Sequence, residues 1–230
     1  MARRERVSLL GVPQHVIQRG NNRQVCFVGD EDFEQYESWL KAYSIKYGVE
    51  IHAWVFMTNH VHLLCTPLAD KAISLMMQAL GRQYVRYFNG KYRRTGTLWE
   101  GRFKSSIVDA EAYLFELYRY IELNPVRAGM VALPEEYYWS SYRVNALGEL
   151  NDLCTPHVLL LGLGRDSIER MEHYRALFDL ALDDGLMSDV RKSTSAGMAI
   201  GREKFKSEMA LLAGRRVSLG VPGRPKKTKV

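Results

Sequence analysis

The chain has 230 residues, 47% hydrophobic and 25% charged, which is typical of a globular protein and excludes disordered, collagen-like and coiled-coil classes. No apolar run approaches the ~20 residues of a membrane span, and no apolar segment of signal-peptide length follows the basic N-terminus. The cysteines, Cys26, Cys65 and Cys154, form neither a disulfide framework nor a CxxC pair, so we expect a protein of the reducing cytoplasm.

The net charge of +6 is concentrated at the C-terminus, where residues 215–230 hold six basic side chains and no acidic one. Within the neutral remainder, residues 82–104 hold seven basic side chains and only Glu100 as an acid. Clusters of one sign are typical of a surface that binds a polyanion. They are also found on solvated helix faces and solubilising tails, so charge alone does not decide between these interpretations.

Hydrophobic periodicity predicts alternating strands and helices in the first part of the chain. In chain order we expect a strand at 15–19, a helix at 31–47, strands at 50–57 and 60–65 joined by a tight turn, a helix at 71–88, a strand at 102–108 and a helix at 109–124. Pro125 must end that last helix.

This order favours an α+β fold, with a ferredoxin-like split βαβ arrangement whose antiparallel sheet has helices on one face. We assign this fold to residues 1–145. Residues 146–216 predict a mainly helical extension, with helices at 165–186 and 202–213. Residues 217–230 contain Pro and Gly without apolar periodicity, which predicts a basic disordered tail.

His60 and His62 form the first candidate for chemistry. Side chains at i and i+2 of a strand point to the same face, so both imidazoles converge while Val61 faces the other side. Two imidazoles this close can share a divalent metal. Two half-exposed histidines of a sheet would give the same pattern.

Tyr120 and Asn124 form the second candidate. They lie four residues apart on one helix face, so both point to one place. A tyrosine phenol is a competent covalent nucleophile, and an asparagine carbonyl is a competent ligand for a hard metal. The other four histidines, His15 among them, have no partner at metal-ligand spacing, and we interpret them as structural.

Three ordered motifs resemble those of the HUH single-strand transposases, and more closely the REP-associated tyrosine transposase branch. They are MTNHVHLL at 57–64, GTLWEGRFK at 96–104 and YIELNPVRAGM at 120–130. The resemblance implies that His60 and His62 bind the metal, that Tyr120 is the nucleophile and that Asn124 completes the metal site. In the wider family a glutamine commonly occupies the position of Asn124, so direct and water-mediated coordination both stay open.

The resemblance implies a metal-dependent endonuclease and strand transferase acting on single-stranded or hairpin DNA, such as REP-like palindromes, through a 5′-phosphotyrosine intermediate. The implied protein is bacterial, cytoplasmic and nucleoid-associated. It is a monomer or homodimer that uses Mg²⁺ or Mn²⁺ and does not bind a membrane. Two alternatives stay open. One is a DNA-binding or regulatory protein without turnover, and the other is a metallophosphoesterase that uses water as the nucleophile.

The predicted DNA contacts are basic, amide or aromatic side chains near the motifs. They are Arg19, Asn21, Asn22 and Arg23 after the first strand, Arg82 and Arg86 on one helix face, and Arg93, Arg94, Trp99, Arg102 and Lys104 in the basic run. In the tail, Arg224, Lys226 and Lys227 belong to a segment that resembles a minor-groove AT-hook.

Overall fold

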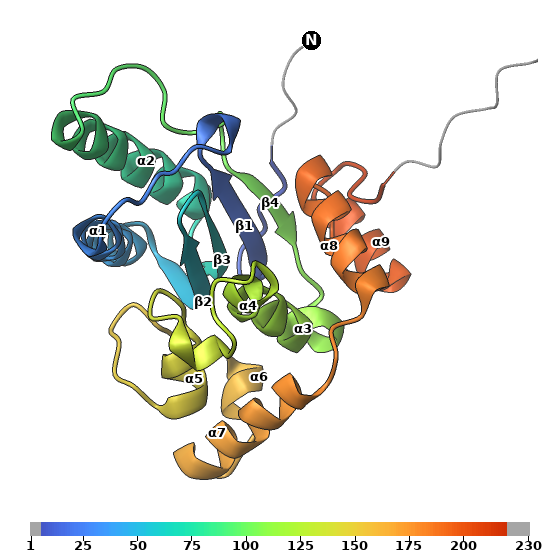
Figure 1. The fold of residues 1–230 in the computed structure, drawn as a ribbon. Helices are drawn as coiled ribbons and strands as arrows, with labels where there is room; N and C mark the ends of the chain where they lie inside the picture. The colour runs from blue at the N-terminus through green and yellow to red at the C-terminus, as the bar shows by residue number, and fades with distance from the viewer. Residues whose placement is uncertain (1–5, 220–230) are drawn as a thin grey trace, which may run out of the picture.

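Four strands form one antiparallel sheet at the centre of the computed structural model, which describes residues 6–219 (Figure 1). The strands are β1 (Gln14–Arg19), β2 (Val49–Met57), β3 (His60–Pro67) and β4 (Lys104–Ile107), in the order β2-β3-β1-β4. This arrangement confirms the predicted α+β class. Strands β1 and β3 are neighbours although helix α1 (Asp30–Tyr47) and β2 separate them in the chain, so residues of both can meet on one face.

The β2–β3 hairpin turns at Thr58 and Asn59, as the sequence predicts, and pairs Met57 with His60. A register shift between Ile51 and Ala53 marks a bulge in β2. It reverses the alternation of the strand, so Ile51 and Trp54 pack into the same core.

One face of the sheet packs against helices α1 (Asp30–Tyr47) and α2 (Ala72–Lys91). Val61 and Leu63 of β3 belong to this core together with Tyr36 of α1 and Tyr84 of α2, all of them fully buried. Gly48 ends α1 with a φ of 68°, a left-handed conformation that glycine adopts without steric cost.

The opposite face is covered by helix α3 (Ala110–Glu122), so the expectation of helices on one face only is wrong. Leu64 of β3 and Val55 of β2 pack here against Leu117 and Ile121 of α3. The reason lies in β2 and β3, whose side chains are apolar on both faces and therefore require cover on both. A one-turn helix, α4 (Asn124–Arg127), follows α3 directly.

Most of the remaining helices extend this second layer, and the last one packs in a separate small core with Ile107 of β4 (Figure 1). They are α5 (Tyr142–Leu147), α6 (Val158–Leu161), α7 (Ser167–Ala176), α8 (Asp184–Ala196) and α9 (Glu203–Leu212), with short 3-10 turns at Asn21–Arg23, Pro134–Glu136 and Leu177–Asp179. The helix expected over residues 165–186 is thus two helices. The second begins where the Asp183 carboxylate accepts a hydrogen bond from the backbone nitrogen of Leu186.

A buried carboxylate ties α3 to this layer. Glu122 is fully buried and accepts hydrogen bonds from Ser141, Asn145 and, on α7, Tyr174, at 2.6, 2.9 and 2.7 Å. Burial raises the pKa of Glu122 to about 7. The three donors satisfy both oxygens of a group that would otherwise be costly to bury.

The C-terminal segment is attached to the free edge of the sheet at β4. The backbone nitrogen of Ile200 donates to Ile107, and that of Asp109 donates to Ile200. Arg202 forms a two-pronged ion pair with Asp109, at 2.7 and 2.9 Å. These bonds place α8 beside β4.

Val217, which the sequence places at the start of a disordered tail, is instead buried, and its carbonyl accepts from the nitrogen of Ala199. Its side chain packs with Ile107 and Met209, so an isolated apolar residue without periodicity still joins a core. Residues 220–230 of the predicted tail lie outside the described part of the chain. No helix among residues 6–219 is long and apolar enough to cross a membrane.

Candidate active site

The two histidines of β3 project toward α3. The ring centres of His60 and His62 lie 5.0 Å apart, as the strand periodicity predicts. His62 is 2% exposed, and its ring centre lies 5.7 Å from that of Tyr120 on α3. The His pair and the tyrosine therefore share one face of the sheet.

Both histidines are oriented through their Nδ1 atoms. Nδ1 of His60 lies 2.6 Å from Oδ1 of Asn59, whose amide nitrogen is held by the carbonyl of Arg23 at 3.2 Å. Nδ1 of His62 lies 2.9 Å from Nε2 of His15 on β1. With Nδ1 engaged in both rings, each Nε2 is left to bind a ligand.

Burial keeps both imidazoles neutral. It lowers the pKa of His60 to about 4, with a smaller contribution from the positive charge of Arg19. Burial likewise lowers the pKa of His62 well below its usual value, and the neighbouring His60 and His15 add to the effect. A neutral imidazole carries the lone pair that a metal or a proton donor requires.

Tyr120 and Asn124 lie one helical turn apart, where α3 passes into α4. The Asn124 amide nitrogen donates to the carbonyls of Tyr120 and Ile121, at 2.7 and 3.2 Å. Pro125 cannot donate a backbone hydrogen bond, and the Asn124 side chain satisfies carbonyls at this junction instead. Within residues 6–219 the Oδ1 atom of Asn124 has no hydrogen-bond donor, so it is free to bind a ligand.

A cleft of about 560 Å³ brings the four predicted residues together. His60, His62, Tyr120 and Asn124 all line it. Its wall also contains the predicted DNA contacts Arg19, Arg23, Arg102 and Lys104, along with Arg127 of α4, Arg191 and Ser195 of α8, and Glu100. The cleft is therefore lined by six Arg or Lys side chains and one acidic side chain.

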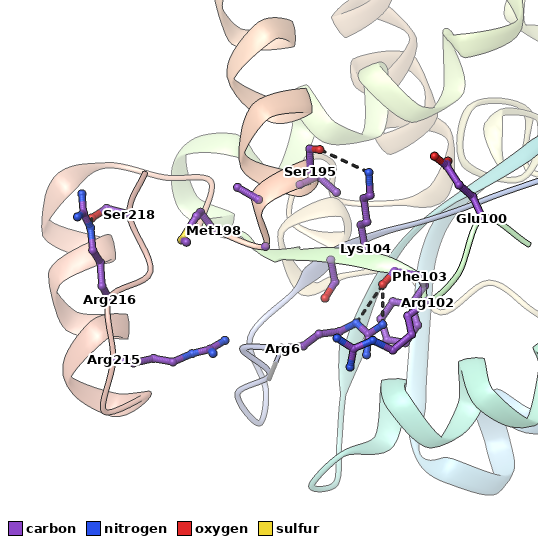
Figure 2. A pocket seen from close by; sticks show the side chains of 14 residues that line it. Arg6, Glu100, Arg102, Phe103, Lys104, Ser195, Met198, Arg215, Arg216 and Ser218 are labelled. Atoms are coloured by element: carbon purple, nitrogen blue, oxygen red, sulfur yellow. Dashed lines mark hydrogen bonds between the residues drawn. The ribbon is translucent and has the colours of Figure 1, made fainter. Parts of the chain in front are cut away.

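A second, larger groove of about 720 Å³ continues from this cleft and shares Glu100, Arg102, Lys104 and Ser195 with it. Its far wall is formed by the C-terminal segment, which contributes Arg215 and Arg216 (Figure 2). Arg215 extends across the groove toward Arg6, whose guanidinium donates to the carbonyl of Phe103 at 2.7 and 3.0 Å. The two cavities form one basic trough along the edge of β4.

Trp99 does not have the role that the sequence predicts. It is 6% exposed and packs in the core against Tyr84, with ring centres 5.8 Å apart, and against Tyr36 at 6.4 Å. Because the ring is covered on the core side of the sheet, it is not presented for stacking on a base. An aromatic residue inside a basic run resembles a nucleic-acid platform, but here the side chain completes the core.

The other predicted DNA contacts of the described chain do not line the cleft or the groove. Asn21, Asn22, Arg82, Arg86, Arg93 and Arg94 are absent from the lining of both cavities in the described chain. Arg94 donates instead to Oε1 of Gln24 at 2.7 Å. Arg224, Lys226 and Lys227 lie outside the described residues.

Arg127, Arg191 and Arg215 line the two cavities but are not among the DNA contacts predicted from the sequence, and His15 was interpreted as structural. His15 is separated from His62 by 47 positions, so only the β1–β3 pairing could have joined them. Arg127 does follow Tyr120 at helical spacing, and its position in the third motif was a usable signal.

The donors at the cleft fit a divalent cation. Nε2 of His60 and His62, with Oδ1 of Asn124, would provide mixed nitrogen and oxygen ligands. Such a set suits manganese and is compatible with magnesium when water or substrate oxygens complete the shell. Within residues 6–219 no three His, Cys, Asp or Glu side chains gather as a metal-binding group. The fit therefore depends on Asn124 and on oxygens from outside the chain.

Among solved structures, the chain is similar to a REP-associated tyrosine transposase bound to a REP hairpin. The two share 18% identity with a TM-score of 0.53, over 69% of this chain and 93% of that one. A protein from Deinococcus radiodurans described as a transposase shares 19% identity with a TM-score of 0.37, over 51% of this chain and 95% of that one. No curated protein matches the sequence.

The family model of IS200-like transposases matches residues 9–124, which is half of the chain and includes β1 to α3 with Asn124. The matched region holds His15, the His pair, Tyr120 and Asn124. The chain belongs to the family of IS200-like DNA transposases.

Proposed function

We propose that the chain is a metal-dependent endonuclease and strand transferase that cuts single-stranded or hairpin DNA through a covalent 5′-phosphotyrosine at Tyr120. The observation that supports this most directly is the convergence of His60, His62, Tyr120 and Asn124 on one basic cleft. A paired histidine motif alone fits a water-using phosphoesterase equally well, whereas a tyrosine placed against that pair favours covalent chemistry.

In the proposed step, the phenolic oxygen of Tyr120 attacks the scissile phosphorus. The new bond joins that oxygen to the 5′ phosphate, and the bond from phosphorus to the 3′ oxygen breaks. The phenolic proton passes to solvent, and the leaving 3′ oxygen takes up a proton. The intermediate keeps the phosphodiester linkage, so a second 3′ hydroxyl can reverse the step and join strands without a nucleotide cofactor.

His60, His62 and Asn124 would hold the divalent cation, Mg²⁺ or Mn²⁺. When bound, such a cation supplies Lewis acidity at the scissile phosphate. The protein itself orients the two imidazoles through Asn59 and His15, and it places Arg127 against the ring of Tyr120. The neutral state of both histidines suits metal binding at neutral pH.

The basic trough supplies contacts to the substrate backbone. Arg19, Arg23, Arg102 and Lys104 line the cleft around Tyr120, and phosphate contacts of this kind position a strand without reading its sequence. The structural relative was solved with a REP hairpin. We therefore propose REP-like palindromes with a single-stranded flank as the substrate class.

The test mixes the full chain with end-labelled hairpin and linear oligonucleotides in Mn²⁺ or Mg²⁺. Wild-type protein should cut and leave a DNA adduct that survives denaturation, and Tyr120→Phe should do neither while binding DNA normally. Tyr118→Phe is the matched control, because its hydroxyl is buried without a hydrogen-bond partner in the described chain. Cleavage without an adduct in wild-type protein would contradict the covalent step.

A further inference from the structure

A buried chain of hydrogen bonds joins His62 to helix α8. His15 of β1 is fully buried, and its Nε2 lies 2.9 Å from Nδ1 of His62. The two ring planes differ by only 7°, and the ring centres lie 5.1 Å apart while the two nitrogen atoms lie much closer together. This is the geometry of a hydrogen bond in the plane of the rings. On its other side, Nδ1 of His15 lies 3.1 Å from Oγ1 of Thr194.

Thr194 is held firmly in this position. It is 1% exposed, and its hydroxyl lies 3.3 Å from that of Ser106 on β4. Val190, one turn earlier on α8, is buried in the core of the second layer. The bonds from Ile200 to β4 and the Arg202–Asp109 ion pair fix the chain just beyond α8. The hydroxyl therefore has a defined place between His15 and Ser106.

A neutral imidazole has one N–H, so the hydrogen bonds that join His62, His15 and Thr194 have two possible proton arrangements. In the first, Nδ1–H of His62 donates to His15, and Nδ1–H of His15 donates to the Thr194 hydroxyl oxygen, which also accepts from the hydroxyl of Ser106. In the second, the Thr194 hydroxyl donates to Nδ1 of His15, Nε2–H of His15 donates to Nδ1 of His62, and His62 carries its proton on Nε2. Only the first leaves a lone pair on Nε2 of His62, which faces the cleft and is required to bind a cation.

We propose that Thr194 is a positioning residue for the metal site, because its hydroxyl oxygen is the acceptor that His15 requires for its Nδ1 proton when His62 is in the metal-binding tautomer. This inference rests on the proposed metal site but not on the role of Tyr120. Thr194 lies well outside the segment that the family model matches, residues 9–124. The C-terminal extension thus supplies a part of the site that the catalytic domain lacks.

The test replaces the hydroxyl without changing the shape of the side chain. In Thr194→Val, a His15 proton on Nδ1 would be buried without an acceptor, so both rings are expected to adopt the reversed arrangement. Mn²⁺ binding to the full chain without DNA is measured by the loss of the EPR signal of free Mn²⁺. We expect an affinity about 10- to 100-fold weaker than wild type, as for other residues that orient a metal ligand. Thr194→Ser should restore it to within about threefold.

Thr66→Val is the matched control. Thr66 lies on β3, the strand of His62, and its hydroxyl is 2.8 Å from Nε2 of a different buried histidine, His52. Thr66→Val removes the same kind of threonine–histidine hydrogen bond, but the other ring nitrogen of His52 meets the carbonyl of Thr155 and not His62. Its Mn²⁺ affinity should equal that of wild type. Equal affinity in wild type and Thr194→Val, or an equal loss in Thr66→Val, would overturn the inference.

A second measurement does not depend on affinity. Protein with ¹⁵N-labelled histidine reports the tautomer of each ring by NMR. His15 and His62 should both carry their protons on Nδ1 in wild type with Mg²⁺, and on Nε2 in Thr194→Val. An Nδ1–H tautomer of His62 in the variant would overturn the inference even if the variant is less stable. If wild-type protein binds Mn²⁺ in a Thr194-dependent way but forms no DNA adduct, only the proposed function fails.

Discussion

The guanidinium carbon of Arg127 lies 5.0 Å from the centre of the Tyr120 ring. The two residues belong to different helices, because α3 ends at Glu122 and α4 begins at Asn124. The Asn124 side chain bonds back to the Tyr120 carbonyl across this junction. The junction therefore sets both the nucleophile and a cation beside it, within the cleft that both residues line.

Replacing Arg127 with methionine should slow cleavage by about a hundredfold with little effect on folding. A fixed positive charge stabilises the negative charge that develops on the Tyr120 oxygen and the phosphate as the bond forms, and loss of one such group costs about 10²- to 10³-fold in rate. Single-turnover cleavage at saturating DNA separates this effect from binding. Arg127→Lys keeps the charge and should retain more activity than Arg127→Met. Equal rates in the methionine variant and wild type would place Arg127 outside the chemistry.

His60→Ala and His62→Ala should abolish metal-dependent cleavage while single-strand affinity changes little, because that affinity comes mainly from Arg and Lys contacts to phosphate. Val61→Ala, on the opposite face of β3, should lower the free energy of unfolding by about 1–2 kcal/mol and leave cleavage intact. Cleavage assays and urea titrations of the three variants provide the comparison. If Val61→Ala lost cleavage as completely as the histidine variants, the assignment of the two faces would be wrong.

The local parts of this site could be predicted from the sequence because they depend on one element at a time. The i, i+2 spacing of His60 and His62 and the i, i+4 spacing of Tyr120 and Asn124 each follow from the geometry of a single strand or helix. His15 could not be found in this way, since its partner Thr194 lies 179 positions away on α8.

The burial of individual side chains is the other feature that could not be predicted from the local sequence. Trp99 follows a run of basic residues, but its exposure is decided by the rings of Tyr84 and Tyr36, which come from two helices. Val217 likewise depends on residues of β4 and α9. Side chains whose environment is assembled from distant segments require the fold itself.

A stability test is provided by Asp32, which is buried on the face of the sheet away from the cleft. Burial alone raises the pKa of this carboxyl, but hydrogen bonds from Lys91, from the Val28 backbone and from Tyr92 outweigh it and hold the pKa below its usual value. Because the folded-state pKa is depressed, the stabilisation is present above the unfolded value of about 3.9 and is lost as pH falls through the folded value.

Asp32→Asn should therefore lower the free energy of unfolding by about 2–3 kcal/mol at pH 7, since Lys91 loses its buried partner, and the deficit should shrink in acid. The control is Glu31→Gln, which removes the exposed partner of the same lysine and should change stability by no more than about 0.5 kcal/mol. Urea unfolding at pH 7 and pH 3 measures both. A deficit of the same size at the two pH values would show that the carboxylate charge is not responsible.

Arg215 and Arg216 line the groove beside the cleft. If a single-stranded flank lies in it, Arg215 and Arg216 contact phosphates and release counterions when DNA binds. Replacing both with glutamine should make the slope of log affinity against log salt shallower by about 1.4, from about 0.7 for each single-strand contact. The change should appear with a hairpin that carries a long flank and disappear when the flank on the groove side is trimmed.

A double variant with the same change in charge separates the groove from net charge. Lys46→Gln with Arg165→Gln removes two exposed basic side chains that do not line either cavity in the described chain. Its slope should match that of wild type, because charges outside the contact surface release few counterions. Equal slopes for both double variants would mean that net charge alone governs binding. A change in the groove variant that persists after the flank is trimmed would place Arg215 and Arg216 on the duplex stem instead.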